Sequence, residues 1–591
     1  MKRSEVKEQY KWRIEDIFSS DEKWEESFKQ AEKAITFSKY AGKLHDSDTL
    51  LKFFKDSDEF DKLVSKLGVY AHMRHDEDAA ISKYNAYYAK IGMLYTKYST
   101  EISFFDPEMA KLDEAYLKGL IADKRFADYD YILKRILERK PHVLSEPEER
   151  LVSMTGEIFS NFSDIFNMID DLELPLPEIE WEGAKTKLSH GMYGVILHSE
   201  NREKRKEAYE KYYGAYTSLI NTITATYFGN VKKDVFMSKA YKYNSCLERA
   251  LFNEDVDRKV YDNLLAAVNT GLPSLHRYVA DRKKLLGYDK LYFYDMYTPL
   301  VSGAEMKLNF DDAYEYVIKG LAPLGKDYQA LLKKGYDERW IDVEETDGKA
   351  GGAYSTGCYG VHPYALLNYK PTTNDIFTVA HEMGHSLHTY FSDKNQPVSK
   401  SSYTFFVAEV ASTVNEVLLL KFMLNDAKDA ALKKYLLNYY LDMIRATLFR
   451  QTMFAEFEYD AHTMVERDEP LTKENLCQLY ADLGKRYYGE AIEHDYNISC
   501  EWSRIPHFYR AFYVYKYSTG IITAMNIANR ILTEGETAVK DYFKFLSGGS
   551  STDPVSLLKL AGVDLMTTKP FEFAMNEFDK TLTDFEKLMG L

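Results

Sequence analysis

The sequence predicts a mainly α-helical protein, and two observations carry this prediction. Apolar residues recur three and four positions apart, between charged ones, along most of the 591 residues, and this is the spacing of an amphipathic helix. Proline, which breaks helix interiors, occurs only 15 times. The pattern is clearest over residues 21–34, 202–216 and 430–448, and we expect a helix in each.

Charge and cysteine content argue against several classes of protein. The formal net charge is −16, whereas a surface that binds nucleic acid needs clustered Lys and Arg, so we expect no nucleic-acid partner. No apolar h-region follows Met1, so we expect no secretory leader, and no apolar run reaches the roughly 18 residues of a membrane span. The four cysteines lack CxxC spacing. We therefore expect a cytoplasmic protein without a membrane partner.

Two stretches break the helical pattern. Over 172–198, the prolines of the sequence LPLPEIEW exclude a helix interior, so we expect short extended segments and a module boundary near residue 190. Over 339–369, closely spaced glycines indicate turns and close backbone approach. Short strands, such as 364–369, are expected between those turns.

A metal-binding pattern begins at residue 381, where the chain has the sequence His-Glu-Met-Gly-His. Residues 372–375 (TTND) precede it and offer several good helix N-caps. On a helix, His381 and His385 lie four apart on one face, so both imidazoles can bind one metal ion. Glu382 is displaced by one position and borders the metal, where a general base for an activated water must stand. The pattern therefore predicts a hydrolytic zinc site.

The third ligand must come from farther along the chain. An HExxHxxGxxH continuation is absent, because His388 and Phe391 occupy its last two key positions; His388 is a weaker candidate ligand and otherwise a packing or supporting residue. The predicted helix at 404–422 has only two acids, Glu409 and Glu416, two turns apart on one face. An unpaired carboxylate is costly in such apolar surroundings. We expect Glu409 to bind the metal and Glu416 to orient a histidine ligand, with the reverse assignment left open.

These motifs resemble those of peptidase family M3, and specifically of its oligoendopeptidase F branch. The resemblance covers most of the chain from about residue 193 onward, and the N-terminal part more weakly. It is carried by the stretches 294–299 (YDMYTP), 351–355 (GGAYS), 381–388 (HEMGHSLH), 406–412 (FVAEVAS) and 505–518 (IPHFYRAFYVYKYS).

The resemblance implies a helical, two-lobed, clam-like peptidase with a deep central channel and a small β element near the active site. It implies an N-terminal region of the oligoendopeptidase F type over 1–190 and an M3-type catalytic region over 191–591. It also implies a cytoplasmic gluzincin with one Zn²⁺ per chain that cleaves short peptides. His381, His385 and Glu409 match the family's zinc ligands, and Glu382 matches its general base.

The stretch 504–517 combines one His with four Tyr. From spacing alone, an aromatic helix packed in the core is the favoured interpretation. The family, however, uses a His and a later Tyr of this region to stabilise the oxyanion, for which either side chain can donate a hydrogen bond. By resemblance these are His507 and Tyr515; Tyr513 and Tyr517 are the alternates and candidate substrate-binding residues.

The glycine-rich stretch 351–355 is expected to form a strand edge with little side-chain bulk. Such an edge can pair with the main chain of an extended peptide, which makes Gly352, Ala353 and Tyr354 candidate substrate-binding residues. A glycine-rich turn without a ligand is the alternative. Family members often have Ser-Gly where this chain has Gly351-Gly352, which leaves the details of the strand open.

The sequence thus predicts a zinc metalloendopeptidase that hydrolyses short oligopeptides, with Glu382 as general base and His507 and Tyr515 stabilising the oxyanion. One alternative is a zinc carboxypeptidase or dipeptidyl carboxypeptidase on a related helical fold, which would hold a substrate's C-terminal carboxylate with Arg or Lys. Another is a non-catalytic peptide-binding protein with structural zinc. A structural site, however, is usually closed by four protein ligands, and the sequence offers only three good candidates.

Overall fold

The computed structural model describes residues 1–301 and 303–591. Contacts divide the chain into two compact units, each assembled from three separate segments. Unit 1 comprises Met1–Val143, Met306–Met423 and Thr523–Asp564, and unit 2 comprises Leu144–Glu305, Leu424–Ile522 and Leu565–Leu591. These boundaries differ from the module boundary expected near residue 190.

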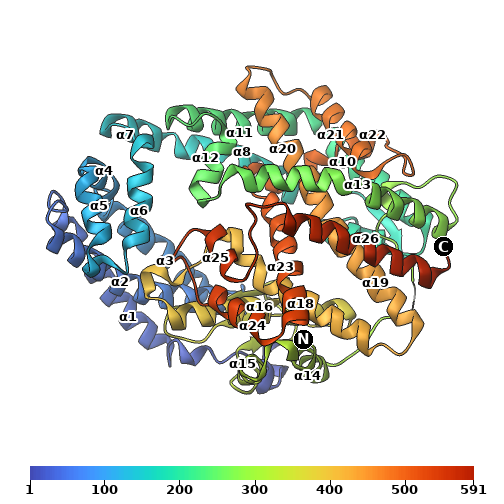
Figure 1. The fold of residues 1–591 in the computed structure, drawn as a ribbon, viewed down its shortest axis with the longest axis horizontal. Coiled ribbons are helices and arrows are strands. Elements are labelled where there is room, and N and C mark those ends of the chain that lie inside the picture. The colour runs from blue at the N-terminus through green and yellow to red at the C-terminus, as the bar shows by residue number, and fades with distance from the viewer. Residues whose placement is uncertain (302) are drawn as a thin grey trace. The chain divides into compact units, whose positions relative to one another are not determined.

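Unit 1 is built mainly from helices (Figure 1). They are α1 (Asp21–Ala34), α2 (Ser47–Glu77), α3 (Ser82–Glu101), α4 (Phe105–Lys111), α5 (Glu114–Ala122), α6 (Asp130–Arg139), α14 (Phe310–Gly320), α15 (Lys326–Asp337), α16 (Thr373–Asn395), α17 (Val398–Ser401), α24 (Glu536–Leu546) and α25 (Pro554–Leu560). Two further helices, α18 (Phe405–Asp426) and α23 (Tyr515–Glu534), cross a boundary between the units. The predicted helix at 21–34 coincides with α1, and that at 404–422 lies within one residue of the start of α18.

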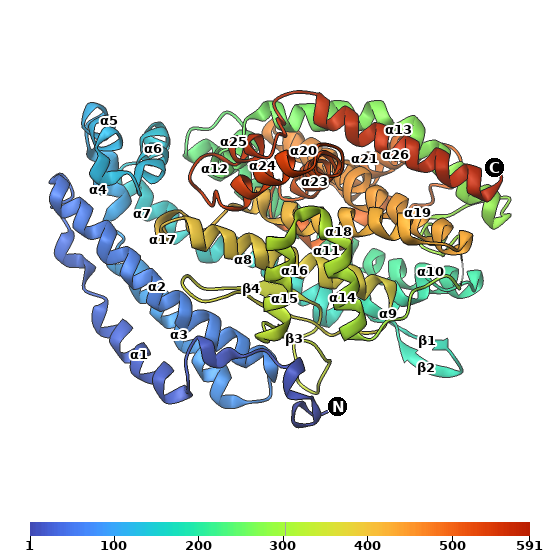
Figure 2. The ribbon, with the colours of Figure 1, turned by 60° about the horizontal axis from the view of Figure 1, so that its bottom comes forward.

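A small sheet lies beside α16 in unit 1 (Figure 2). Its strands are β3 (Ile341–Asp342), β4 (Tyr354–Thr356) and β5 (Tyr364–Leu366), in the order β3-β5-β4. The central strand β5 is buried throughout and pairs parallel to β3 and antiparallel to β4. The glycine-rich stretch therefore contains short strands, as predicted, and β4 forms an edge of the sheet.

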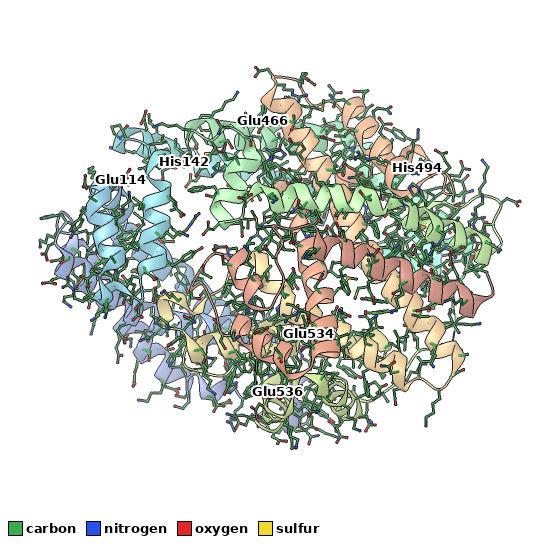
Figure 3. All side chains as sticks on the ribbon, in the orientation of Figure 1. Glu114, His142, Glu466, His494, Glu534 and Glu536 are labelled. Atoms are coloured by element: carbon green, nitrogen blue, oxygen red, sulfur yellow. The ribbon has the colours of Figure 1, made fainter. Side chains whose placement is uncertain are left out.

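The helices α2 and α3 lie side by side in unit 1, over a core rich in aromatic residues. Trp24 of α1 is fully buried and stacks on Tyr87 of α3, with ring centroids 3.8 Å apart. Many charged residues lie at the surface; for example, Glu534 and Glu536 flank the turn between α23 and α24, and the side chain of Glu536 is 82% exposed (Figure 3). This division between apolar interior and charged surface is what the amphipathic spacing predicts.

Unit 2 is also mainly helical. Its helices are α7 (Glu146–Met154), α8 (Gly156–Met168), α9 (His190–Leu197), α10 (Arg202–Ser218), α11 (Ile220–Ala240), α12 (Cys246–Glu254), α13 (Arg258–Leu286), α19 (Ala430–Ile444), α20 (Arg450–Glu466), α21 (Lys473–Tyr488), α22 (Tyr496–Ser499) and α26 (Lys569–Met589). The predicted helices at 202–216 and 430–448 correspond to α10 and to α19 with the π-helical turn that follows it.

The stretch 172–198 is only partly extended. As expected, it contains a hairpin, formed by β1 (Glu178–Trp181) and β2 (Ala184–Lys187). Its last part is wrong as an extended segment, because α9 begins at His190. Ser189 caps that helix by accepting the Met192 N–H at 3.2 Å, and the helix buries Ile196 and a neighbouring leucine.

The prediction of a mainly helical protein is confirmed. The two lobes and the deep channel concern the placement of the units, so they stay predictions. Among the described helices, none combines the length and the apolar character needed to cross a membrane.

Candidate metal centre

Helix α16, which carries the HExxH pattern, begins at the predicted place. Thr372 is the N-cap, and its hydroxyl oxygen accepts the backbone N–H of Asp375 at 3.2 Å. The Asp375 carboxylate in turn accepts the backbone N–H of Lys370 at 3.0 Å. These bonds satisfy N–H groups at and before the first turn and fix where the helix starts.

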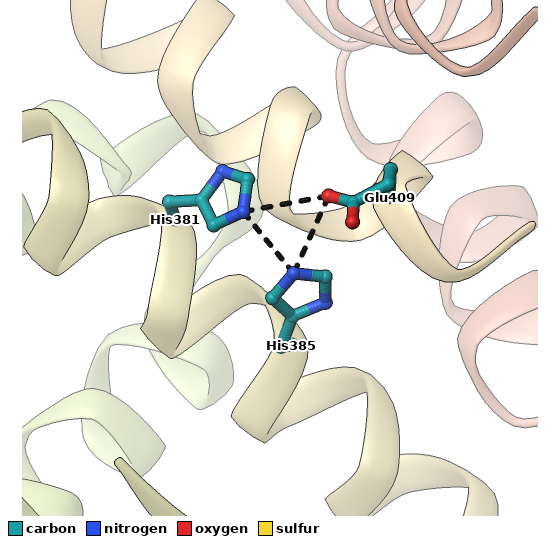
Figure 4. Close-up of side chains that lie close together, drawn as sticks. All are labelled: His381, His385 and Glu409. Atoms are coloured by element: carbon teal, nitrogen blue, oxygen red, sulfur yellow. Dashed lines mark hydrogen bonds and ion pairs between the residues drawn. The ribbon is translucent and has the colours of Figure 1, made fainter. Parts of the chain in front are cut away.

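Three side chains from α16 and α18 bring one donor atom each to a common point (Figure 4). The Nε2 atoms of His381 and His385 lie 3.1 Å apart. The Oε2 atom of Glu409 lies 3.4 Å from each of those nitrogens. A tetrahedral Zn²⁺ with bonds of about 2.0–2.1 Å separates its ligand atoms by about 3.3–3.4 Å. The three atoms thus form a triangle of the right size to hold a metal ion, and no fourth protein ligand joins this group among the described residues.

Glu416 contacts His381, one of the three residues of this triangle. Its Oε1 atom lies 2.8 Å from Nδ1 of His381, the ring nitrogen that does not face the other ligands. A carboxylate in this position fixes the ring orientation and makes the imidazole a stronger ligand. Burial acts to lower the pKa of His381, but the carboxylates of Glu416 and Glu409 outweigh it and hold that pKa well above its ordinary value.

Glu409 is strongly favoured in its charged form. Burial acts to raise the pKa of its carboxyl, but the hydrogen bonds from His381 and His385 outweigh burial and hold the pKa far below its usual value. Ser412 adds a weaker hydrogen bond, with its hydroxyl 3.3 Å from Oε2 of Glu409. The acid therefore offers an anionic oxygen to a cation, as a metal ligand must.

The two helices approach closely because the HExxH pattern contains a glycine. A Cβ atom on Gly384 would lie 2.5 Å from Cα of Ser412 and 2.7 Å from the carbonyl oxygen of Ala411. Farther along, the Asn415 side chain donates to the carbonyl oxygen of Ala380 at 2.9 Å, and Tyr328 donates to Asn415 at 2.9 Å. These contacts fix the distance between α16 and α18 and thereby position Glu409 relative to the two histidines.

Glu382 lies beside the triangle and is 7% exposed. Its Oε2 atom is buried and has no hydrogen-bond partner among the described residues. Burial raises the pKa of this carboxyl above its ordinary value, against the attraction of the two nearby histidines. A buried carboxyl with one oxygen that has no partner among the described residues, beside a metal-sized triangle, is suited to accept a proton from a water there.

His388 is not part of the metal-sized group found among the described residues. Its ring is 1% exposed and stacks on Tyr403, with centroids 3.7 Å apart and planes 4° apart. Burial, together with the charge of His385, lowers its pKa to about 3. These contacts favour a packing role over the weaker alternative of a ligand.

The edge strand β4 connects the metal helix to α2. The hydroxyls of Ser355 and of Ser386 on α16 lie 2.8 Å apart. The neighbouring Tyr354 contacts α2 instead, where its hydroxyl donates to Asp76 at 2.8 Å and its ring stacks on His72, with centroids 5.3 Å apart. The other edge of β4 has no strand partner among the described residues.

Gly352 and Ala353 lead into this strand. Gly352 has a left-handed backbone with φ of 79°, a conformation that favours glycine. Its carbonyl oxygen accepts a hydrogen bond of 2.8 Å from the Asn368 side chain. Gly352 is exposed and Ala353 is half-buried, so the main chain at the start of β4 is accessible.

The predicted oxyanion residues, His507 and Tyr515, belong to unit 2, whereas the three residues of the metal triangle belong to unit 1. His507 is exposed, and its Nε2 atom lies 3.3 Å from the hydroxyl of Tyr517. The ring of Tyr513 is 6.0 Å from that of His507 and 5.5 Å from that of Tyr517. The structure therefore groups His507 with the two alternates.

Tyr515, the tyrosine predicted by resemblance, lies in a different environment, and its role as oxyanion donor stays a prediction. It is 1% exposed, and its ring packs edge-on against Tyr261, 5.3 Å away. Burial raises its pKa well above the ordinary value. Helix α23 begins at Tyr515, so Tyr513 lies before the helix and Tyr517 lies within it.

A strained turn precedes α23. Phe512 has φ of 54°, a left-handed backbone that is rare for a bulky residue. Its N–H donates to the carboxylate of Glu458 at 2.7 Å, and its ring lies 4.8 Å from His462. Glu458 is 1% exposed. This buried acid therefore holds the turn between His507 and Tyr517.

Several of these residues were not predicted from the sequence. Gly384 has a visible signal, since glycine in a helix interior costs about 1 kcal/mol relative to alanine and needs a reason. Asn415 is a polar residue within an apolar helical run, which is also a signal. Asp76 and Glu458 have none, because their partners are distant in sequence.

Comparison with known proteins gives a consistent picture. The model described as peptidase family M3 matches residues 195–577, and one described as oligopeptidase F matches residues 108–174. The chain is 44% identical to oligopeptidase PepF of Bacillus subtilis over 591 residues, which is 99% of this chain and 88% of that protein. It is 38% identical to an oligoendopeptidase F homolog of Lactococcus lactis subsp. lactis, with 99% of this chain and 98% of that protein covered.

Solved structures are similar as well. Oligoendopeptidase F from Enterococcus faecium matches with a TM-score of 0.76 at 34% identity, covering 96% of this chain and 99% of that chain. A protein from Chlamydophila abortus matches with a TM-score of 0.92, also at 34% identity, and the match covers 99% of both chains.

Proposed function

The chain belongs to peptidase family M3, and we propose that it cleaves short peptides internally with one Zn²⁺ held by His381, His385 and Glu409. The observation that carries the proposal is the triangle of donor atoms 3.1–3.4 Å apart. Two imidazoles and one carboxylate are the ligand set of a catalytic zinc site that leaves a position for water or substrate. Glu416 completes the arrangement as the partner of His381.

In this proposal Glu382 moves the protons. A zinc ion, when bound, supplies a Lewis acid that activates a water and polarises the scissile carbonyl. Glu382 accepts the proton of the attacking water and then passes it to the leaving amine. Its burial and its unpartnered Oε2 atom support this role, because a carboxyl with a raised pKa is better able to carry a proton near neutral pH.

The exposed edge of β4 provides the means to hold a peptide. An extended substrate can add a strand to this edge and bond to the main chain around Gly352, Ala353 and Tyr354. Main-chain pairing gives affinity that does not depend on sequence, which suits an enzyme that acts on many short peptides.

His507 and Tyr517 are proposed to stabilise the oxyanion, with Tyr513 beside them. Their hydroxyl and imidazole groups lie 3.3 Å apart, so both can donate to one oxygen atom. Partial desolvation of the ring by neighbouring residues, with the charges of Arg450 and Arg510, lowers the pKa of His507, which favours a neutral ring that donates without carrying charge.

The substitution Glu382→Gln tests the role of Glu382. It keeps the size of the side chain but removes the base, so we expect full zinc content and a kcat lowered by roughly 10²–10⁴-fold. Zinc is measured by mass spectrometry, and kcat with internally quenched peptides whose C-termini are blocked. Wild-type cleavage of blocked peptides supports an endopeptidase, and a dependence on a free C-terminus supports a carboxypeptidase. Full activity of the variant would overturn the base assignment.

The compartment and the absence of nucleic-acid and membrane partners stay predictions from the sequence. Membership of peptidase family M3 implies peptide substrates, and zinc stays the proposed metal.

A further inference from the structure

Side chains on the two faces of strand β4 contact different helices. Ser355 contacts Ser386 on α16, the helix of the metal ligands, whereas Tyr354 contacts His72 and Asp76 on α2. Successive side chains of a strand point to opposite faces. A peptide that pairs with β4 follows the same alternation, so every second side chain of that peptide faces α2.

A hollow of about 360 Å³ lies between α2 and α3, and His72 is part of its lining. The ring of His72 lies 5.9 Å from the ring of Tyr88 on α3. His72 thus bridges the edge strand and the hollow, forming a continuous aromatic strip from Tyr354 through His72 to Tyr88.

Two helix-interior glycines, Gly68 on α2 and Gly92 on α3, line the hollow and contribute no side chain to it. A glycine in a helix interior costs about 1 kcal/mol relative to alanine. A Cβ atom on Gly92 would meet nothing within 4 Å, so helix packing does not require glycine there. Glycine at position 92 therefore leaves this space open.

The walls of the hollow are aromatic and exposed. Tyr88 and Tyr95 lie two turns apart on one face of α3 and are 52% and 47% exposed. The described lining residues include no Lys, Arg, Asp or Glu. Asp76, which lies next to the lining, is already paired with His72 at 2.9 Å and with His75 at 2.8 Å, whereas an apolar side chain in the hollow would lose unfavourable contact with water.

We propose that this hollow is a specificity site that takes an apolar, preferentially aromatic, side chain of the substrate peptide. The inference rests on the proposed function, in which the peptide pairs with β4. The peptide residue opposite Tyr354 has its Cβ atom about 4.5–5.5 Å from that of Tyr354 and on the same face. Its side chain therefore lies over His72 and enters the hollow, while its neighbours along the peptide face α16.

The test uses a series of alanine-rich peptides of about ten residues, each with a single Phe at a different position. We measure kcat/KM for each peptide with the wild type and with Gly92→Leu. In the wild type we expect one position at which Phe raises kcat/KM at least about tenfold over Ala, as a filled apolar pocket does, and at which Lys or Asp does not. Gly92→Leu places a side chain in open space and fills the hollow. We expect it to reduce the Phe-to-Ala ratio at that position to about twofold or less, through a higher KM for the Phe peptide.

Gly119→Leu is the matched control. Gly119 is an exposed glycine in the interior of α5, and a Cβ atom there would also meet nothing within 4 Å. We expect this variant to keep the wild-type Phe-to-Ala ratio at every position.

Different failures contradict different claims. A Phe-to-Ala ratio that Gly92→Leu leaves unchanged, or a wild type that accepts Lys as well as Phe at every position, would overturn the specificity site alone. A wild-type enzyme loaded with zinc that cleaves none of the peptides would overturn the proposed function, and the specificity site with it.

Discussion

The carboxylates of Glu409 and Glu416 contact different atoms of the same histidine. Glu409 faces Nε2 of both His381 and His385, whereas Glu416 contacts only Nδ1 of His381. One acid can therefore bind a metal directly, and the other acts through the imidazole. This difference separates two residues that are equivalent in the sequence pattern.

Substituting the two acids separately tests this assignment. We expect Glu409→Ala to lose stoichiometric zinc, because one of the three protein ligands is removed. Glu416→Ala should bind zinc about 10–100-fold more weakly, as loss of a carboxylate behind a ligand histidine typically does. Zinc affinity is measured by competition with a chromophoric chelator. Stoichiometric zinc in Glu409→Ala, with a metal-free Glu416→Ala, would exchange the two roles.

A second comparison at the residue scale concerns the tyrosines of the 513–517 stretch. We expect Tyr517→Phe to lower kcat by roughly 10²–10³-fold, as removal of one oxyanion donor does, with little change in KM. Tyr515→Phe should keep kcat within about threefold, because its hydroxyl is buried in unit 2. Steady-state kinetics on one quenched peptide measures both variants. The opposite order of effects would support Tyr515 as the oxyanion donor instead.

The close contact between helices α16 and α18 determines the geometry of the metal centre. Gly384 allows the backbones to touch at Ser412 and Ala411, and a methyl group there has no room, since the nearest atoms are backbone. We expect Gly384→Ala to destabilise the fold by about 1–3 kcal/mol and to weaken zinc binding by separating Glu409 from the histidines. Thermal unfolding with and without zinc measures both effects.

Gly119→Ala provides the control for that substitution. Gly119 also lies in a helix interior, but a Cβ atom there meets nothing, so alanine should be neutral or stabilising by up to about 1 kcal/mol. Equal behaviour of the two alanine variants would show that the close approach at Gly384 does not matter.

The turn held by Glu458 should make stability depend on pH. Burial raises the pKa of Glu458 from its ordinary 4.5 to about 8, while His462, Asp234 and Lys516 also face it and the charges of His462 and Lys516 oppose the shift. The folded protein thus binds a proton that the unfolded chain releases above pH 4.5. Its contribution to stability is fully present below that pH and is lost as pH rises toward 8.

His462 adds a contribution of the same sign. Burial acts to lower its pKa, but the hydrogen bond to Asp234 outweighs burial and raises it, so its stabilisation is also lost as pH rises through the folded pKa. We expect the wild-type Tm to fall between pH 5.5 and 8.5 by roughly 3 °C or more beyond the fall in Glu458→Gln. Parallel pH profiles of Tm for the two proteins would contradict this account of Glu458.

At the scale of the whole molecule, each unit gathers three segments that are far apart in the chain. In unit 1, for example, Arg3 forms an ion pair of 2.6 Å with the buried Asp342 of β3. Such contacts have no local sequence pattern, because helical periodicity reports only which face of a helix is apolar. The expected boundary near residue 190 was drawn from local breaks and therefore could not reveal this interleaving.

Features that depend on local geometry were predictable from the sequence. The helical class, the Thr372 cap region and the placement of His381 and His385 on one face all follow from spacing along a single helix. Local spacing does not decide among the tyrosines, because their environments depend on where α23 starts, after the left-handed Phe512. The hollow could not be predicted from the sequence either, because Gly68 and Gly92 lie on different helices.

The most direct test of the metal centre is an anomalous difference map from crystals of the full chain, measured at the zinc absorption edge. The account predicts one strong peak about 2.0–2.2 Å from Nε2 of His381, Nε2 of His385 and Oε2 of Glu409. A fully occupied zinc peak elsewhere in the molecule, or none at this position in crystals of active enzyme, would contradict it.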